Sequence, residues 1–258
     1  MSALTQQVQR HVLRLHIRLL ACRERLAAGT DQRALHDLRV AVRQLRNLLR
    51  PLPAYSGAEA LTSAAAQLGR TSGGLRDLEV LDGFLRRHGD SASRAAQARQ
   101  TQLAQGYQQL LQGMALAELL RALDAWPQQW RAANATGELA GVARRVRRRL
   151  AKDEQRLLLA LHDPEHDWHD LRLLVKRLRY GLDAYPEQGR VLVVQYPQLK
   201  QAQTALGKWH DCWQWLQRAT SDEDLQPWVN QWQGALGRGE QRVAKVLTQL
   251  RQAWPHVV

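Results

Sequence analysis

The chain has 258 residues, of which 45% are hydrophobic, so it can bury a substantial core without disulfide bonds. Its two cysteines, Cys22 and Cys212, form no C-x-x-C pair and are expected to be reduced residues of the core. No segment has the roughly 18 consecutive apolar residues of a membrane span, and residues 1–10 do not resemble a signal peptide. We therefore expect a soluble, cytoplasmic protein. The formal net charge of +13 favours an anionic partner: nucleic acid, polyphosphate, or an acidic membrane or granule surface.

Apolar residues recur at helical spacing along nearly the whole chain and β-branched residues are sparse, which predicts an all-α fold. Residues 191–194 form the only run rich in β-branched residues, and the run is too short for a convincing strand. Turn-forming residues predict breaks that leave about eight or nine helices. The breaks fall at residues 28–31, 51–57, 88–93, 126–127, 134–137, 162–167, 186–189 and 221–224.

One polar segment occurs twice, with its second copy 133 residues after the first. Each copy has a histidine followed by cations 3, 7 and 10 residues later. On an α-helix these offsets lie within roughly 80° of one another, so each copy lines one helix face, opposite a leucine-rich face that is expected to be buried. We call the copies the first and second stripe. The first stripe is His36, Arg39, Arg43 and Arg46, and the second is His169, Arg172, Lys176 and Arg179.

The repeat extends beyond the stripes in both directions. A glycine followed four residues later by aspartate recurs as Gly73 and Asp77, and as Gly207 and Asp211. A basic helix precedes each stripe by 22 residues, with Arg14 and Arg18 in one copy and Arg147 and Arg148 in the other. This duplication predicts two helical bundles related by a pseudo-twofold axis, with repeats at about 1–125 and 138–258. The stripes would face each other or a shared groove, where a polyanion would neutralise their repulsion.

Four motifs in this order are similar to those of the CHAD domain, the conserved histidine α-helical domain. They are His36-x-x-Arg39-x-x-x-Arg43-x-x-Arg46, Gly73-x-x-Arg76-Asp77, His169-x-x-Arg172-x-x-x-Lys176-Arg177-Leu178-Arg179-Tyr180 and Leu206-Gly207-x-x-His210-Asp211. The resemblance implies a single domain over residues 1–258, made of two pseudo-twofold-related four-helix bundles with a basic central groove. It also implies binding of inorganic polyphosphate and an association with polyphosphate granules. Gln44 and Asn47 depart from the usual pattern and could weaken the first stripe.

The predicted ligand is a polyphosphate chain threaded between the bundles and held by arginine, lysine and histidine donors. The predicted donors are Arg14, Arg18, His36, Arg39, Arg43, Arg46, Arg147, Arg148, His169, Arg172, Lys176, Arg179, Lys200 and Lys208. Two roles stay open for the two stripe histidines, because they either contact the ligand or are structural. Asp77 and Asp211 are expected to orient arginines or to cap helices rather than to act as catalytic acids.

No sequence motif supports catalysis or a cofactor. The chain lacks a P-loop, a Gly-x-Ser-x-Gly elbow and a His-Glu-x-x-His helix, so we expect a non-catalytic protein. Residues 162–169 are rich in histidine and carboxylate, but their spacing fits no standard zinc pattern and predicts a solvated turn. Nucleic-acid binding is the main alternative, although the stripes lack interleaved aromatic residues and the tryptophans are expected in the core. A phosphate-processing enzyme is a third possibility.

Overall fold

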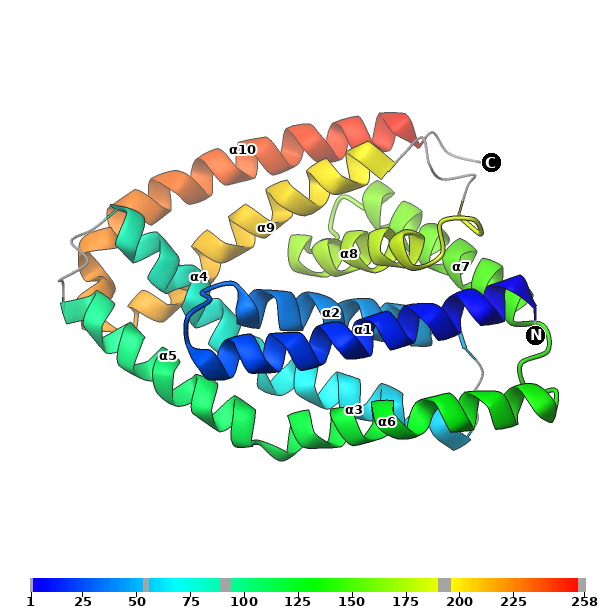
Figure 1. The fold of residues 1–258 in the computed structure, drawn as a ribbon. Helices are drawn as coiled ribbons and strands as arrows, with labels where there is room; N and C mark the ends of the chain where they lie inside the picture. The colour runs from blue at the N-terminus through cyan, green and yellow to red at the C-terminus, as the bar shows by residue number, and fades with distance from the viewer. Residues whose placement is uncertain (1, 53–55, 89–93, 190–195, 255–258) are drawn as a thin grey trace. The chain divides into compact units, whose positions relative to one another are not determined.

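The computed structural model describes residues 2–52, 56–88, 94–189 and 196–254 (Figure 1). Over these ranges the chain is helical and contains no strand, which confirms the all-α prediction. Residues 191–194 lie outside the described residues. The elements are α1 (Ala3–Ala28), α2 (Ala34–Leu49), α3 (Ser56–Thr71), α4 (Gly73–His88), α5 (Arg94–Gln112), α6 (Met114–Ala135), α7 (Val142–His162), α8 (Trp168–Ala184), α9 (Tyr196–Ala219), the 3₁₀ helix η2 (Glu223–Trp228) and α10 (Val229–Ala253).

The chain divides into two compact units, Met1–Val146 and Arg147–Val258. The first unit contains α1 to α6, and the second contains most of α7 together with α8, α9, η2 and α10. The boundary lies near the start of the second predicted repeat. The predicted arrangement of both repeats around a shared groove stays a prediction.

In the first unit, four helices contact one another in a ring. Helix α1 packs on α2, α2 on α3, α3 on α6, and α6 on α1. Helix α1 buries one stripe of apolar residues, among them Val12, Leu19 and Leu26, whose spacing of seven places them on one face. In α6, the rings of Trp126 and Trp130 stack at 4.9 Å and both side chains are fully buried. Helices α4 and α5 form a further pair, with α5 also in contact with α1.

In the second unit, α7, α8, α9 and α10 also contact one another in a ring, each helix packing on the next and α10 on α7. Helix α9 contacts both α8 and α10. Trp254 follows the last residue of α10, and its indole N–H donates to Glu154 of α7 at 3.2 Å, so the end of α10 contacts α7. Helix α7 meets α8 at Gly181, where an added Cβ would lie 2.9 Å from Leu150 Cδ2. A glycine at this position therefore allows the two helices to approach closely. Trp232 of α10 is fully buried in the core of this unit.

Two helix boundaries of the first unit differ from the sequence prediction. Helices α3 and α4 are separated at Ser72, whereas the corresponding region of the second unit is continuous within α9. Helices α5 and α6 are separated at Gly113, where an added Cβ would lie 2.8 Å from the carbonyl oxygen of Gln109. Only glycine fits this bend, because the obstructing atom belongs to the backbone. A single glycine within a helical pattern gave no signal of this break.

The break predicted at residues 126–127 is wrong, because α6 continues through Pro127. Proline removes one backbone hydrogen bond from a helix interior. The neighbouring Trp126 and the next-turn Trp130 are both fully buried. Their packing stabilises the helix on both sides of the proline. No helix in the described part of the chain is long and apolar enough to span a membrane.

Candidate anion-binding clusters

The second unit gathers two histidines and two cations from different helices. Asp167 caps the start of α8 by accepting hydrogen bonds from the backbone N–H groups of His169 at 2.7 Å and Asp170 at 3.1 Å. This cap fixes the stripe histidine in the first turn of α8. The ring of His210, from the middle of α9, lies 4.8 Å from the His169 ring, measured between centroids. We call His169, Arg172, Lys176 and His210 the second-unit cluster.

His210 is the buried member of this cluster. His210 is only 5% exposed. Its Nδ1 atom is buried and has no hydrogen-bond partner among the described residues. Burial, together with the positive charges of Arg172, His169 and Lys176, lowers the pKa of His210 to about 4. The Trp213 ring stacks on His210 at 5.8 Å between centroids. His210 therefore lies buried among positively charged side chains.

Sequence reasoning missed His210 as a site residue. Its motif, Leu206-Gly207-x-x-His210-Asp211, is part of the repeat, but the donors predicted on α9 are Lys200 and Lys208. The spacing of residues within one helix identifies those that share a face. It does not show that α8 packs on α9, because that contact is part of the tertiary structure. The signal available in the sequence was the equivalence of His210 with Arg76, since each lies three residues after the repeated glycine.

The first unit carries a related cluster made by α2 and α4. Burial lowers the pKa of His36, and the positive charges of Arg76 and Arg43 lower it further, while Asp37 opposes them. Arg76 donates to Glu79 at 2.6 Å, and the same carboxylate accepts a hydrogen bond from Tyr107 at 2.7 Å. Arg76 is thus held beside His36. We call His36, Arg39, Arg43 and Arg76 the first-unit cluster.

Arg39, predicted as a ligand donor, supports the junction of α3 and α4. Its Nη1 donates to the carbonyl oxygen of Gly69 at 3.1 Å and to the hydroxyl of Ser72 at 2.8 Å. Ser72 is fully buried and donates in turn to the carbonyl oxygen of Leu68 at 2.6 Å. Burial lowers the pKa of Arg39, and the negative charge of Asp77 raises it. Asp77 therefore lies close enough to act on Arg39 with its charge, and its predicted orienting role stays a prediction.

The last cation of each stripe is directed toward the next helix. Arg179 donates through Nε to Gln203 on α9 and through Nη1 to Asp183 at 2.9 Å. Arg46 lies over Gly69, where an added Cβ would be 3.0 Å from its Nη1. Gly69 and Gln203 each lie four residues before the repeated glycine. In both units, therefore, the last cation of the stripe lies against the helix that follows.

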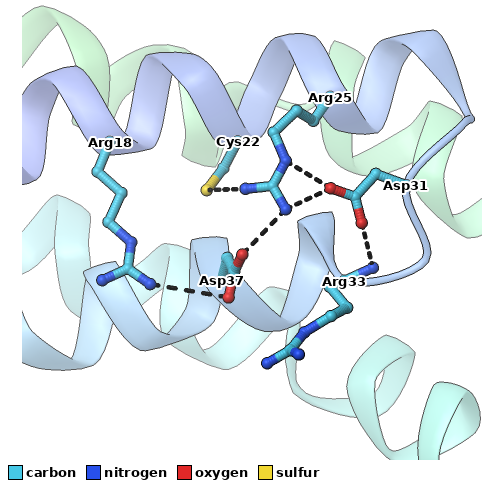
Figure 2. A network of polar contacts seen from close by, with 6 residues as sticks. All are labelled: Arg18, Cys22, Arg25, Asp31, Arg33 and Asp37. Atoms are coloured by element: carbon cyan, nitrogen blue, oxygen red, sulfur yellow. Dashed lines mark hydrogen bonds and ion pairs between the residues drawn. The ribbon is translucent and has the colours of Figure 1, made fainter.

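The loop between α1 and α2 uses Arg18 in a polar network (Figure 2). Arg25 donates through Nε to Asp31 at 2.6 Å and through Nη2 to Asp37 at 2.9 Å. Arg18 lies 3.7 Å from the other oxygen of Asp37. The backbone N–H of Arg33 donates to Asp31 at 2.8 Å. Asp37, which follows the stripe histidine, thus joins α2 to α1.

The remaining predicted donors are exposed on helix surfaces. These donors are Arg14, Arg147, Arg148, Lys200 and Lys208.

No group of three or more His, Cys, Asp or Glu side chains in the described ranges is arranged to hold a metal ion. The histidine-rich loop before α8 is built from local turns, in which the side chain of Asp163 accepts a hydrogen bond from the Glu165 backbone at 3.0 Å.

The fold and the clusters define an all-helical protein with a duplicated histidine and arginine motif. The profile of the CHAD domain family matches residues 11–220, and the chain belongs to this family. No curated protein matches the chain. The crystal structure of the CHAD domain from the plant Ricinus communis matches it with a TM-score of 0.72 and 21% sequence identity, over 98% of this chain and 91% of that chain. At this identity the likeness shows the fold alone.

Proposed function

We propose that the chain binds inorganic polyphosphate without breaking or forming bonds in it. The observation that carries this proposal is the second-unit cluster, in which the rings of His169 and His210 lie 4.8 Å apart and Arg172 and Lys176 act on His210 with their positive charges. Cations that lie close enough to disfavour a further positive charge create a site that an anion would stabilise. The first-unit cluster repeats this environment around His36.

Polyphosphate suits these clusters because every residue of the polymer carries negatively charged oxygens. Guanidinium, ammonium and imidazole groups all donate hydrogen bonds to phosphate oxygens. A chain with a net charge of +13 also attracts polyanions at long range. Membership of the CHAD family supports this choice of ligand, and an association with polyphosphate granules would follow from it.

Nucleic acid is the second candidate, and the structure adds one observation in its favour. Trp213 is 42% exposed and stacks on His210, beside the cations of the second-unit cluster. Exposed aromatic rings next to cations are used by proteins to stack the bases of single strands. The exposure of Trp213 differs from the sequence prediction, which expects the tryptophans in the core.

One competition experiment separates these candidates. Labelled long-chain polyphosphate is bound to the protein and challenged with single-stranded DNA, duplex DNA or RNA at equal phosphate concentration. We expect polyphosphate to remain bound. Displacement by nucleic acid would overturn the proposal in favour of the second candidate. Release of orthophosphate during the incubation, abolished by His36→Gln and His169→Gln, would instead establish an enzyme.

A further inference from the structure

The two clusters differ in one chemical respect at equivalent positions. Arg76 in α4 and His210 in α9 each follow the repeated glycine by three residues and precede an aspartate. Arg76 is charged at every physiological pH, and its charge is balanced by Glu79 at 2.6 Å. His210 is an imidazole, which gains or loses its charge near neutral pH unless its surroundings shift it. One unit therefore carries a fixed charge where the other carries a titratable group.

The surroundings of His210 leave its hydrogen-bonding capacity partly unused. Its Nδ1 atom is buried and has no partner among the described residues, although buried polar atoms are nearly always paired. Its ring contacts are with His169 of α8 at 4.8 Å and with Trp213 and Trp209 of its own helix at 5.8 and 6.3 Å. An unused nitrogen inside a cationic cluster indicates a group whose protonation changes when a ligand is present.

The described charges that act on His210 come from α8. They are Arg172, His169 and Lys176, and all of them oppose its protonation. Helices α10 and η2 also pack against α9 but contribute no described charge to His210. An anion bound at this cluster would compensate the α8 cations, and so would remove part of the opposition to a positive imidazole.

We propose that His210 couples anion binding by the second unit to the uptake of one proton, a proposal that rests on the proposed polyphosphate-binding function. The proton comes from solvent and is held by the imidazole of His210 while phosphate oxygens occupy the cluster. The first unit, with Arg76 at the equivalent position, binds without this coupling at that position. At this one position, the duplicated protein thus carries a titratable group in one unit and a permanent charge in the other.

The direction of the effect follows from linkage. In the free protein the pKa of His210 is lowered to about 4, and the bound anion raises it. Between these two values, binding takes up a proton, so affinity increases as pH falls, by up to about tenfold per pH unit for one proton. Above the bound-state pKa the imidazole is neutral in both states, and below about 4 it is charged in both. Affinity contributed by His210 is constant outside this window.

The test measures the imidazole directly and uses tripolyphosphate as the probe. The His210 Cε1–H signal of the full chain is followed by NMR from pH 4 to 8, with and without saturating tripolyphosphate. Calorimetric titrations in buffers of different ionisation enthalpy count the protons taken up on binding. We expect a raised pKa for His210 in the complex and net proton uptake at pH 5 to 6.

Three variants make the result specific. His210→Gln removes the titratable group, and the difference in proton uptake between it and the wild type cancels the titration of the ligand itself. His210→Arg supplies a permanent charge, as in the first unit, and is expected to bind at pH 7.5 at least as tightly as the wild type but with a flatter pH profile. Arg76→His is the reciprocal change and is expected to steepen the profile.

The outcomes distinguish this inference from the proposed function. If tripolyphosphate and long-chain polyphosphate both fail to bind the folded wild type at every pH, the proposed function fails and this inference with it. If they bind but the His210 signal titrates identically with and without ligand, only the proton coupling is overturned. Equal proton uptake by the wild type and by His210→Gln would also overturn the proton coupling. This comparison does not depend on whether His210→Arg folds.

Discussion

Arg39 and Ser72 are joined by a hydrogen bond of 2.8 Å that connects α2 to the junction between α3 and α4. The same guanidinium nitrogen donates to the carbonyl oxygen of Gly69, near the end of α3, where a positive charge is favourable. A residue identified from sequence as a phosphate donor therefore has a structural role as well. Its charge stabilises a corner that has no counterpart in the continuous α9.

The first prediction concerns the stability provided by this corner. Arg39→Ala is expected to lower the free energy of unfolding by about 1–3 kcal/mol, because it leaves a buried hydroxyl and a backbone carbonyl with fewer partners. Urea denaturation measures the change, with Arg242→Ala on the exposed face of α10 as the control. A double-mutant cycle with Ser72→Ala should show coupling between the two side chains. Additive effects would mean that the hydrogen bond contributes nothing to stability.

The second prediction concerns acid stability of the loop between α1 and α2. The backbone N–H of Arg33 and the side chain of Arg25 lower the pKa of Asp31 below its ordinary value of 3.8. A carboxyl whose pKa is lowered by folding stabilises the folded state above its unfolded pKa, and this stability is lost as pH falls toward the folded pKa. The unfolding midpoint of the wild type should therefore fall with pH below about 4.

The matched variants for this prediction are Arg25→Gln and Asp31→Asn. Both should show a weaker fall in the unfolding midpoint between pH 5 and 2 than the wild type, measured by thermal denaturation at low salt. Arg23→Gln serves as a control, because Arg23 pairs with the neighbouring Glu24 on the exposed surface of α1. Identical pH profiles for the wild type and Arg25→Gln would show that the network of Figure 2 does not stabilise the loop in solution.

The third prediction separates the last cations of the two stripes. The Arg179 side chain is only 15% exposed and bonds to Gln203 and Asp183, whereas Arg46 is an exposed residue that lies over Gly69. Arg179→Ala should cost about 1–3 kcal/mol of stability, since charge-assisted bonds in a half-buried site are lost. Arg46→Ala should cost under about 1 kcal/mol. Chemical denaturation compares the two, and equal losses would contradict the assignment of Arg179 to helix packing.

Most of the helices and the shared face of each stripe could be predicted from sequence, because they depend on local periodicity. The spacing of His36, Arg39 and Arg43 already fixes their common face on α2. The duplication then identifies the corresponding residues of α8. These inferences need no knowledge of how one helix packs on another.

The remaining features depend on tertiary contacts, which the spacing of residues does not encode. The run of α6 through Pro127 follows from the burial of its flanking tryptophans, and the break at Gly113 follows from a single backbone clash. The presence of His210 beside His169 follows from the packing of α9 on α8. The hydrogen bond from Arg179 to Gln203 also depends on the packing of α9 on α8. The structural role of Arg179 could therefore not be inferred from the spacing of the stripe alone.

The fourth prediction concerns the salt dependence of polyphosphate binding. Each cation that neutralises a phosphate releases counterions, so the logarithm of the affinity falls linearly with the logarithm of the salt concentration. Lys176→Gln and Arg43→Gln remove one cation from the second-unit and first-unit clusters respectively. Each should weaken binding and reduce the magnitude of that slope by about 0.7, the value per contact for single-stranded nucleic acids.

The measurement is a series of binding titrations with polyphosphate of one defined length, over a range of sodium chloride concentrations. Arg242→Gln carries the same loss of net charge at an exposed position of α10 and controls for long-range attraction. Its slope should match that of the wild type. If all three variants lower the slope equally, binding depends on net charge alone, and the two clusters would not be the sites at which phosphate is held.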